Sequence, residues 1–411
     1  MKWIRSFLPF FVALACASSL FADVGEEESI DDDDVRALRE WLNTKRQVTI
    51  NEKGGALSIS GEVRTEFQTT NERRNGIKQR GFGGATTLAG SSFDVEADFM
   101  MDYRTDRTWA SIRLKFDNDA GIFGGTDNKI KLDRAYFGVR LLDRDTYTLT
   151  SEIGRRKLGN IFDSKIEFDS RFDGILVAYD AAFEKIGNFY THVGAFIINE
   201  NSNQYGYAGE IGLLNVVNTG FYTKYSLIDW DTGHYKNKLE RRRFEFLVSQ
   251  LILGYRWIPQ SLNKVVIFYM GGLYNHLAHK LEITRHRKLN WGAYTGVSIG
   301  ELKKKGDWSL DMNYQLVGPQ AVPDFDVTGI SLGNADKSGF YSLKDDGSGG
   351  ATTRATAAGK GNYRGYQISL EYLLTNNINL FQSWQDSTTL YSGVGPFRRF
   401  KQYEVEFIYG F

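Results

Sequence analysis

The stretch that decides the fold is YEVEFIYGF, residues 403–411. Apolar or aromatic residues occupy every second position, and Glu404 and Glu406 lie between them. Because a β-strand points successive side chains to opposite faces, this segment has one apolar face and one largely polar face. Such a strand suits a barrel in lipid, where ladder hydrogen bonds satisfy the backbone. The alternating residues are Tyr403, Val405, Phe407, Tyr409 and Phe411.

This ending resembles the C-terminal assembly signal of Gram-negative outer-membrane barrels. The resemblance rests on the alternating aromatic positions and on the final Phe411. It implies that the five alternating residues form the assembly signal, and that the barrel assembly machinery is a partner. It also implies that the protein lies in the lipid of the cell outer membrane of a Gram-negative bacterium.

Residues 1–22 are predicted to form a signal peptide. Two basic residues precede an apolar run from Phe7 to Ala17, and a plausible cleavage site follows Ala22. The one cysteine, Cys16, lies inside this segment, so the mature chain would have no thiol for a disulfide or a zinc site. Acylation of Cys16, as in a lipoprotein, is the weaker alternative, because Ala13 stands where leucine is usual.

Residues 23–53 are predicted to form an acidic N-terminal segment with one short helix. The run DVGEEESIDDD (23–33) is strongly acidic, whereas Asp34 can cap a helix that continues to Arg46. We expect this helix to brace the periplasmic end of a barrel that occupies residues 54–411. Contact with a periplasmic partner or with peptidoglycan is the alternative.

The rest of the chain alternates apolar with polar residues in one segment after another. In the clearest segment, 57–68, apolar side chains fall mainly on odd positions and polar ones on even positions. The mature chain has no apolar run of about 20 residues, so no membrane-spanning helix is predicted. The pattern predicts an all-β fold, a transmembrane antiparallel up-and-down β-barrel of about sixteen strands. The predicted strands lie near 57–68, 93–103, 110–117, 134–141, 147–154, 173–180, 188–198, 205–213, 219–228, 244–257, 264–275, 290–300, 307–317, 363–374, 377–386 and 399–411.

Long and short connections between these strands alternate, which is typical of outer-membrane barrels with long outer loops and short periplasmic turns. An even number of strands places both ends of the barrel on the periplasmic side. The long connections lie near 69–91, 118–130, 157–172, 199–204, 229–243, 276–289, 318–362 and 387–398, and the short ones near 105, 143, 182, 215, 260, 303 and 375.

Aromatic residues favour a membrane barrel over a soluble β-sandwich. They make up 14% of the chain and recur on the apolar face towards strand ends, where a barrel has its interfacial girdles. A sandwich buries its apolar face against a second sheet and has no such need. The girdle residues are Phe67, Tyr103, Tyr147, Trp291, Trp308, Tyr366 and Tyr372.

The polar face is predicted to line an aqueous lumen, because about sixteen strands enclose a barrel too wide for side chains to fill. Segment 93–103 presents acids to this lumen, and segments 110–117 and 134–141 present bases. Opposite charges on neighbouring strands can pair with one another. They can also create an electric field across the pore that selects solutes by charge and dipole. The predicted pore-lining residues here are Glu96, Asp98, Arg113, Lys115, Arg134 and Arg140.

The connection GRRKLGNIFDSKIEFDSRFDG (154–174) is predicted to narrow the pore. By its position as the third long loop it resembles the loop that folds into the pore of sixteen-stranded general porins, and the chain as a whole resembles Gram-negative outer-membrane porins. Residues 38–67 look like the start of porin-like proteins from Chlamydia-related bacteria. The Gly-, Ser- and Thr-rich loop 318–362 is the competing constriction. The predicted constriction residues are Asp163, Lys165, Glu167, Asp169 and Arg171.

Other kinds of site are not predicted. Basic and acidic residues number 50 each, so no global charge favours nucleic acid. The chain has no nucleophile elbow, phosphate loop or dinucleotide fingerprint. His276, His279 and His286 have a spacing that could bind a metal, but nearby basic residues disfavour a cation. We therefore predict no catalytic residues, no metal and no cofactor.

The predicted function is a porin, a water-filled channel for ions and small hydrophilic solutes with weak charge selectivity. The alternatives are a substrate-specific channel of the same fold, and a non-conducting surface barrel whose loops bind a partner. The resemblance to porins implies a homotrimer.

Overall fold

The computed structural model describes residues 48–52, 55–119, 130–200, 204–231, 245–281, 284–330, 343–345, 351–353, 361–394 and 396–411. The predicted signal peptide, 1–22, and the predicted helix, 34–46, lie outside these residues. Within the described ranges, no helix has the length and apolar character needed to cross a membrane.

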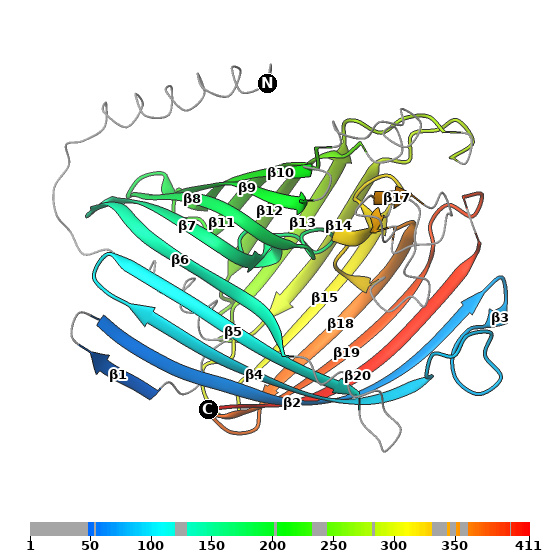
Figure 1. Ribbon diagram of the computed structural model, residues 1–411, viewed down its shortest axis with the longest axis horizontal. Coiled ribbons are helices and arrows are strands. Elements are labelled where there is room, and N and C mark those ends of the chain that lie inside the picture. Colours follow the sequence, from blue (N-terminus) through cyan, green and yellow to red (C-terminus); the bar gives the residue numbers. More distant parts are fainter. Residues whose placement is uncertain are drawn as a thin grey trace. The chain divides into compact units, whose positions relative to one another are not determined.

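Sixteen antiparallel strands form a closed barrel (Figure 1). Each strand pairs with the next, and β20 pairs with β2 from Glu62–Gly410 to Arg74–Arg398, which closes the sheet. The predicted barrel of about sixteen strands is therefore confirmed. The barrel strands are β2 (Gly55–Arg74), β4 (Ser91–Arg104), β5 (Thr108–Asp119), β6 (Lys131–Arg144), β7 (Tyr147–Lys157), β8 (Arg171–Phe183), β9 (Gly187–Asn199), β10 (Gln204–Val216), β11 (Phe221–Asp229), β12 (Leu247–Trp257), β13 (Val266–Asn275), β14 (Trp291–Ile299), β15 (Trp308–Val317), β18 (Tyr363–Leu373), β19 (Ile378–Thr389) and β20 (Arg398–Gly410).

Four short strands were not predicted. β1 (Val48–Glu52) and β3 (Ile77–Lys78) both pair with β2, one near each end of that long strand. β16 (Leu343–Asp345) and β17 (Ala351–Thr353) pair with each other in a separate hairpin within the connection between β15 and β18. Strands of two to five residues contain too few alternations to be recognised from the sequence.

The outer face of the barrel is apolar, as the alternation predicts. Phe67 lies opposite Phe93 of β4 and Val405 of β20, and all three side chains point outward. Phe67 is 44% exposed, although a large aromatic side chain in a water-soluble protein would be buried. The predicted girdle residues Trp291, Tyr366 and Tyr372 are likewise exposed on this face. An apolar outer face of this kind is suited to contact with the hydrocarbon chains of a lipid bilayer.

Short turns lie at one end of the barrel and long connections at the other, as predicted. The start of β2 pairs with the end of β4, beside the turn at 105–107. The end of β20 pairs with Glu62 near the same end of β2. Both ends of the barrel sheet therefore lie at the short-turn end.

The inside–outside assignment predicts different outcomes for two adjacent arginine substitutions. Phe67→Arg places a cation on the outer face, where the cost is roughly 2–4 kcal/mol at the bilayer midplane and falls towards the interfacial girdle to which Phe67 is assigned. Gln68→Arg places it on the inner face, where Gln68 donates a hydrogen bond to Glu66. We expect Phe67→Arg to lower the yield of heat-modifiable barrel measurably and Gln68→Arg to leave it close to wild type. The measurement compares unheated with boiled samples by electrophoresis after insertion into vesicles. Equal loss of barrel in both variants would contradict the assignment of faces.

Candidate functional site

One side of the barrel interior carries most of the strand charges, and we call this side the charged wall. It consists of inner-face residues of the closing strands β2 and β20 and of their neighbours β4, β5 and β6. Successive even positions of β2 and β4 face the same side, which brings their carboxylates next to the bases of β5. The charged wall comprises Glu62, Arg64, Glu66, Glu96, Asp98, Arg113, Lys115, Arg134 and Glu406.

Bases and acids of the charged wall pair across neighbouring strands. Arg113 donates a hydrogen bond to Asp98 and lies 3.7 Å from the Glu62 carboxylate. Lys115 Nζ lies 2.8 Å from Glu96 Oε2. Arg64 is within 4.0 Å of three carboxylates, including Glu406 at 3.3 Å. The structure thus brings together Glu96, Asp98, Arg113 and Lys115, four of the predicted pore-lining residues.

The other two predicted bases lie apart from this network. Arg134 is the cross-strand partner of Arg113, and its Nη1 donates a long hydrogen bond of 3.4 Å to Ser111 Oγ. Arg140 lies near the short turn between β6 and β7, where its Nη1 is 2.7 Å from Asp143 Oδ2. Arg140 therefore belongs to the short-turn end of the barrel, away from the inward loop described next.

Residues 158–170, which we call the inward loop, fold back onto the inner face of the barrel. The loop begins with the 3-10 turn Leu158–Asn160 after β7. Gln250 of β12 donates a hydrogen bond to the Asp163 carbonyl at 2.8 Å and accepts one from Ser164 at 2.8 Å. The Asp163 N–H donates to Glu210 of β10 at 3.1 Å. Since Glu210 and Gln250 face the barrel interior, the loop lies inside the barrel.

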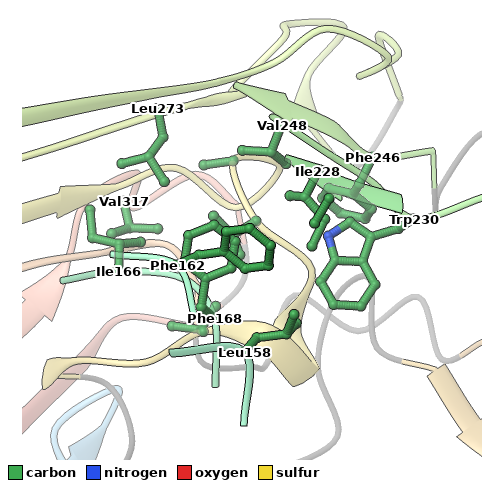
Figure 2. Packing of buried hydrophobic residues seen from close by; sticks show 14 of the residues in the cluster. Leu158, Phe162, Ile166, Phe168, Ile228, Trp230, Phe246, Val248, Leu273 and Val317 are labelled. Carbon is green, nitrogen blue, oxygen red and sulfur yellow. The ribbon is translucent and has the colours of Figure 1, made fainter. Parts of the chain in front are cut away.

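Apolar side chains anchor the inward loop to the wall. Phe162, Ile166 and Phe168 are almost completely buried and belong to one cluster with wall residues of β11 to β15. Figure 2 shows these loop side chains together beside the wall residues. Full burial of one such side chain is worth ~1.5–3 kcal/mol, so the cluster holds the loop firmly. The labelled wall residues are Ile228, Val248, Leu273 and Val317.

A second segment, residues 318–330, packs against the inward loop. Asp326 is fully buried there, and its carboxylate accepts the backbone N–H groups of Phe168 and Ser170, both at 3.0 Å. The Thr328 N–H donates to the Ile166 carbonyl at 2.8 Å. Phe168 has φ of 80°, a conformation that costs an aromatic residue energy and persists only when its surroundings fix it. The hydrogen bonds to Asp326 supply that restraint.

The charged residues predicted in the loop mostly meet partners on the strands. Asp163 Oδ2 lies 2.7 Å from Lys224 Nζ of β11, and Lys165 Nζ lies 3.3 Å from Asp311 Oδ1 of β15. Asp169 is 2.8 Å from Lys157, and Glu167 is only 1% exposed. Arg171, at the start of β8, lies 3.5 Å from Asp133, which is also 3.9 Å from Arg113.

Several residues of this region were not predicted as site residues. Glu210, Lys224 and Gln250 lie on strands that were predicted, but nothing in their own sequence marks them as partners of the loop. Asp311 lies on the predicted strand 307–317, and nothing in that segment marks it as a partner of Lys165. Asp326 lies 158 residues from Phe168 in the chain, so only the folded barrel reveals their contact.

A set of three carboxylates in the described part of the chain is close enough to be tested as a metal site. Oxygen atoms of Glu66, Glu404 and Glu406 lie within 4.8 Å of one another on the inner face. Neighbouring groups already satisfy them, since Gln68 donates to Glu66, Gln402 to Glu404, and Arg64 pairs with Glu406. We assign no metal to this set.

Comparison with solved structures supports the fold. Salmonella typhi OmpF, in a complex with daunomycin, shares 12% sequence identity, with a TM-score of 0.52 over 89% of this chain and 100% of that chain. Pseudomonas putida OprB shares 10% identity, with a TM-score of 0.50 over 86% of this chain and 94% of that chain. No protein-family model and no curated protein sequence matches the chain. At this level of identity the likeness is one of fold alone.

Proposed function

We propose that the protein is an outer-membrane porin, a water-filled channel through which ions and small hydrophilic solutes diffuse. One observation carries the proposal: a closed barrel of sixteen strands has an apolar outer face, a charged inner face and a loop packed inside it. The apolar outer face suits lipid, and the inner face suits water. The inward loop fills only part of a barrel of this width.

The narrowest part of the channel is proposed to lie between the charged wall and the inward loop. Asp163 and Lys165 keep 41% and 39% of their side chains exposed, so they remain accessible beside the wall-bound core of the loop. Glu167 is buried and takes no part in lining the path. Because opposite charges alternate around this path and pair with one another, we expect weak charge selectivity.

Planar-bilayer conductance of the purified protein tests the proposal. We expect stable single-channel currents in KCl that scale with salt concentration. Addition of a sugar or an amino acid then separates two kinds of channel, because a solute that binds inside the pore reduces the current. Absence of conductance from correctly folded, heat-modifiable protein would favour the surface barrel whose loops bind a partner.

Charge-removal variants test the proposed constriction. The positive charge of Arg113 offsets the negative charges of Asp98 and Glu62. The double variant Arg113→Ser with Arg134→Ser should therefore make the charged wall more negative. The reversal potential should shift towards the value of a cation-selective channel. Asp163→Asn frees Lys224 and should shift it towards anions. Both shifts should shrink from ~0.1 M to ~1 M salt, as the Debye length falls from about 10 Å to about 3 Å.

The control for these shifts is Arg144→Ser, which removes an exposed arginine at the turn between β6 and β7. It should leave the reversal potential unchanged. If the Arg113 and Arg134 double variant behaves like this control at low salt, the charged wall does not border the constriction.

A further inference from the structure

Glu167 is a buried carboxyl group that the proposed channel leaves without a role. Its side chain is 1% exposed, and among the described residues neither carboxyl oxygen has a hydrogen-bond partner. Its neighbours in the chain, Ile166 and Phe168, both belong to the apolar cluster that anchors the inward loop. An ionised carboxylate without partners is very costly in such surroundings, because burial removes its hydration.

The groups around Glu167 offer it no compensating charge. Asp326 of the second segment and Glu210 of β10 are acidic and oppose ionisation, and the third neighbouring group is the neutral Tyr294 of β14. Lys224 of β11 pairs with Asp163, and Lys165 of the loop pairs with Asp311. The His192 ring lies against the Ile161 carbonyl at 3.2 Å. The packed loop therefore favours a neutral Glu167.

We propose that Glu167 is a proton-operated latch: protonated, it lets the inward loop pack on the barrel wall, and ionised, it releases the loop. The inference rests on the proposed channel only for its effect on conductance. The packing of the loop itself is independent of solute flow. Release would change the channel because the loop lies inside the barrel.

The direction of the pH dependence follows from burial. Burial raises the pKa of Glu167 well above its usual 4.5, and the charges of Asp326 and Glu210 add to this effect. Burial also raises the pKa of Asp326 to about 7. In a released loop the Glu167 carboxyl meets water and regains its ordinary pKa. Below about pH 4.5 Glu167 is protonated in both the packed and the released loop, so protonation favours neither state. As the pH rises from there towards the pKa of Glu167 in the packed loop, the packed state loses stability relative to the released state.

Hydrogen exchange tests the latch without using conductance. The full mature protein, its Glu167→Gln variant and the control Glu184→Gln, at an exposed turn carboxylate, are compared at pH 5.5 and pH 8.5. Amides of residues 158–170 should exchange faster in wild type than in Glu167→Gln at pH 8.5. The difference should be up to roughly tenfold for each pH unit by which the pKa of Glu167 in the packed loop exceeds its pKa in the released loop. At pH 5.5 the difference should be much smaller, and Glu184→Gln should follow wild type at both values. Glu167→Met, which is apolar and of similar size, should also remain protected.

Conductance over the same pH range provides the second measurement. We expect wild-type current to change and become noisier above neutral pH, while the current of Glu167→Gln changes much less, with its remaining pH dependence coming from Asp326. Equal loop exchange in wild type and Glu167→Gln at pH 8.5 would overturn the latch, even if the channel conducts. Faster exchange confined to wild type in a barrel that never conducts would support the latch and refute the proposed channel.

Discussion

Replacing Phe411 by Asp is expected to leave the protein secreted but unassembled, with almost no heat-modifiable barrel in the outer membrane. The backbone of Phe411 forms two hydrogen bonds of 3.0 Å with Gly61, and these extend the ladder that closes the barrel. Its ring packs on Gly61, where an added Cβ would lie 2.6 Å from the ring. The ring also faces outward and stacks on Tyr409 with centroids 6.4 Å apart. A carboxylate there removes these contacts and places charge on the outer face. It also changes the residue on which the proposed assembly signal depends.

Fractionation of cells into periplasm and outer membrane, followed by electrophoresis with and without heating, measures this effect. Phe82→Asp is the matched control, because Phe82 is fully exposed in the connection between β2 and β4. The same change of side chain should be harmless there. Phe411→Tyr should assemble, since it keeps the ring. Normal amounts of folded Phe411→Asp in the outer membrane would show that this residue is not part of an assembly signal.

Strand prediction succeeded because a membrane barrel imposes strict alternation on its sequence. The predicted segments 205–213 and 377–386, in which the alternation is short, correspond to the full strands β10 and β19. Lipid on one face and a polar lumen on the other apply to every strand, so period 2 survives along the whole chain. Strand ends were less precise, because alternation continues beyond the last ladder pair or stops short of it.

The inward loop was predictable in position but not in its contacts. Its place after β7 indicated the correct loop, whereas its wall partners depend on the register of strands far away in the chain. Phe162 and Phe168 read as ordinary loop aromatics until β11 to β15 are placed beside them. Loop 318–362 was predicted as the competing constriction, and its residues 318–330 pack closely against the inward loop, because the Asp326 carboxylate accepts hydrogen bonds from the backbone of Phe168 and Ser170.

Removing the inward loop is expected to widen the channel while the barrel persists. Lys157 and Arg171 are cross-strand partners at the ends of β7 and β8, so an Asn-Gly turn can replace residues 158–170 and close the hairpin. The strand ladder then remains intact, and only the material inside the barrel is lost. Single-channel conductance should rise roughly two-fold or more, because current follows the open cross-section of the narrowest part. Liposome swelling should also admit larger sugars.

The control removes residues 81–88 from the connection between β2 and β4, replacing them with Gly-Gly, and keeps Arg80, which pairs with Glu72 of β2 at 3.1 Å. The backbone hydrogen bonds of this segment join it to itself, for example Gly81 to Leu88, and to the adjacent Lys78 and Gln79. Among the described residues it contributes no side chain to the apolar cluster that anchors the inward loop. Its loss should leave conductance and sugar permeation close to wild type. If the variant lacking residues 158–170 folds and conducts like this control, the inward loop does not limit flow. The narrowest part would then have to be sought on the charged wall or in the long connection between β15 and β18.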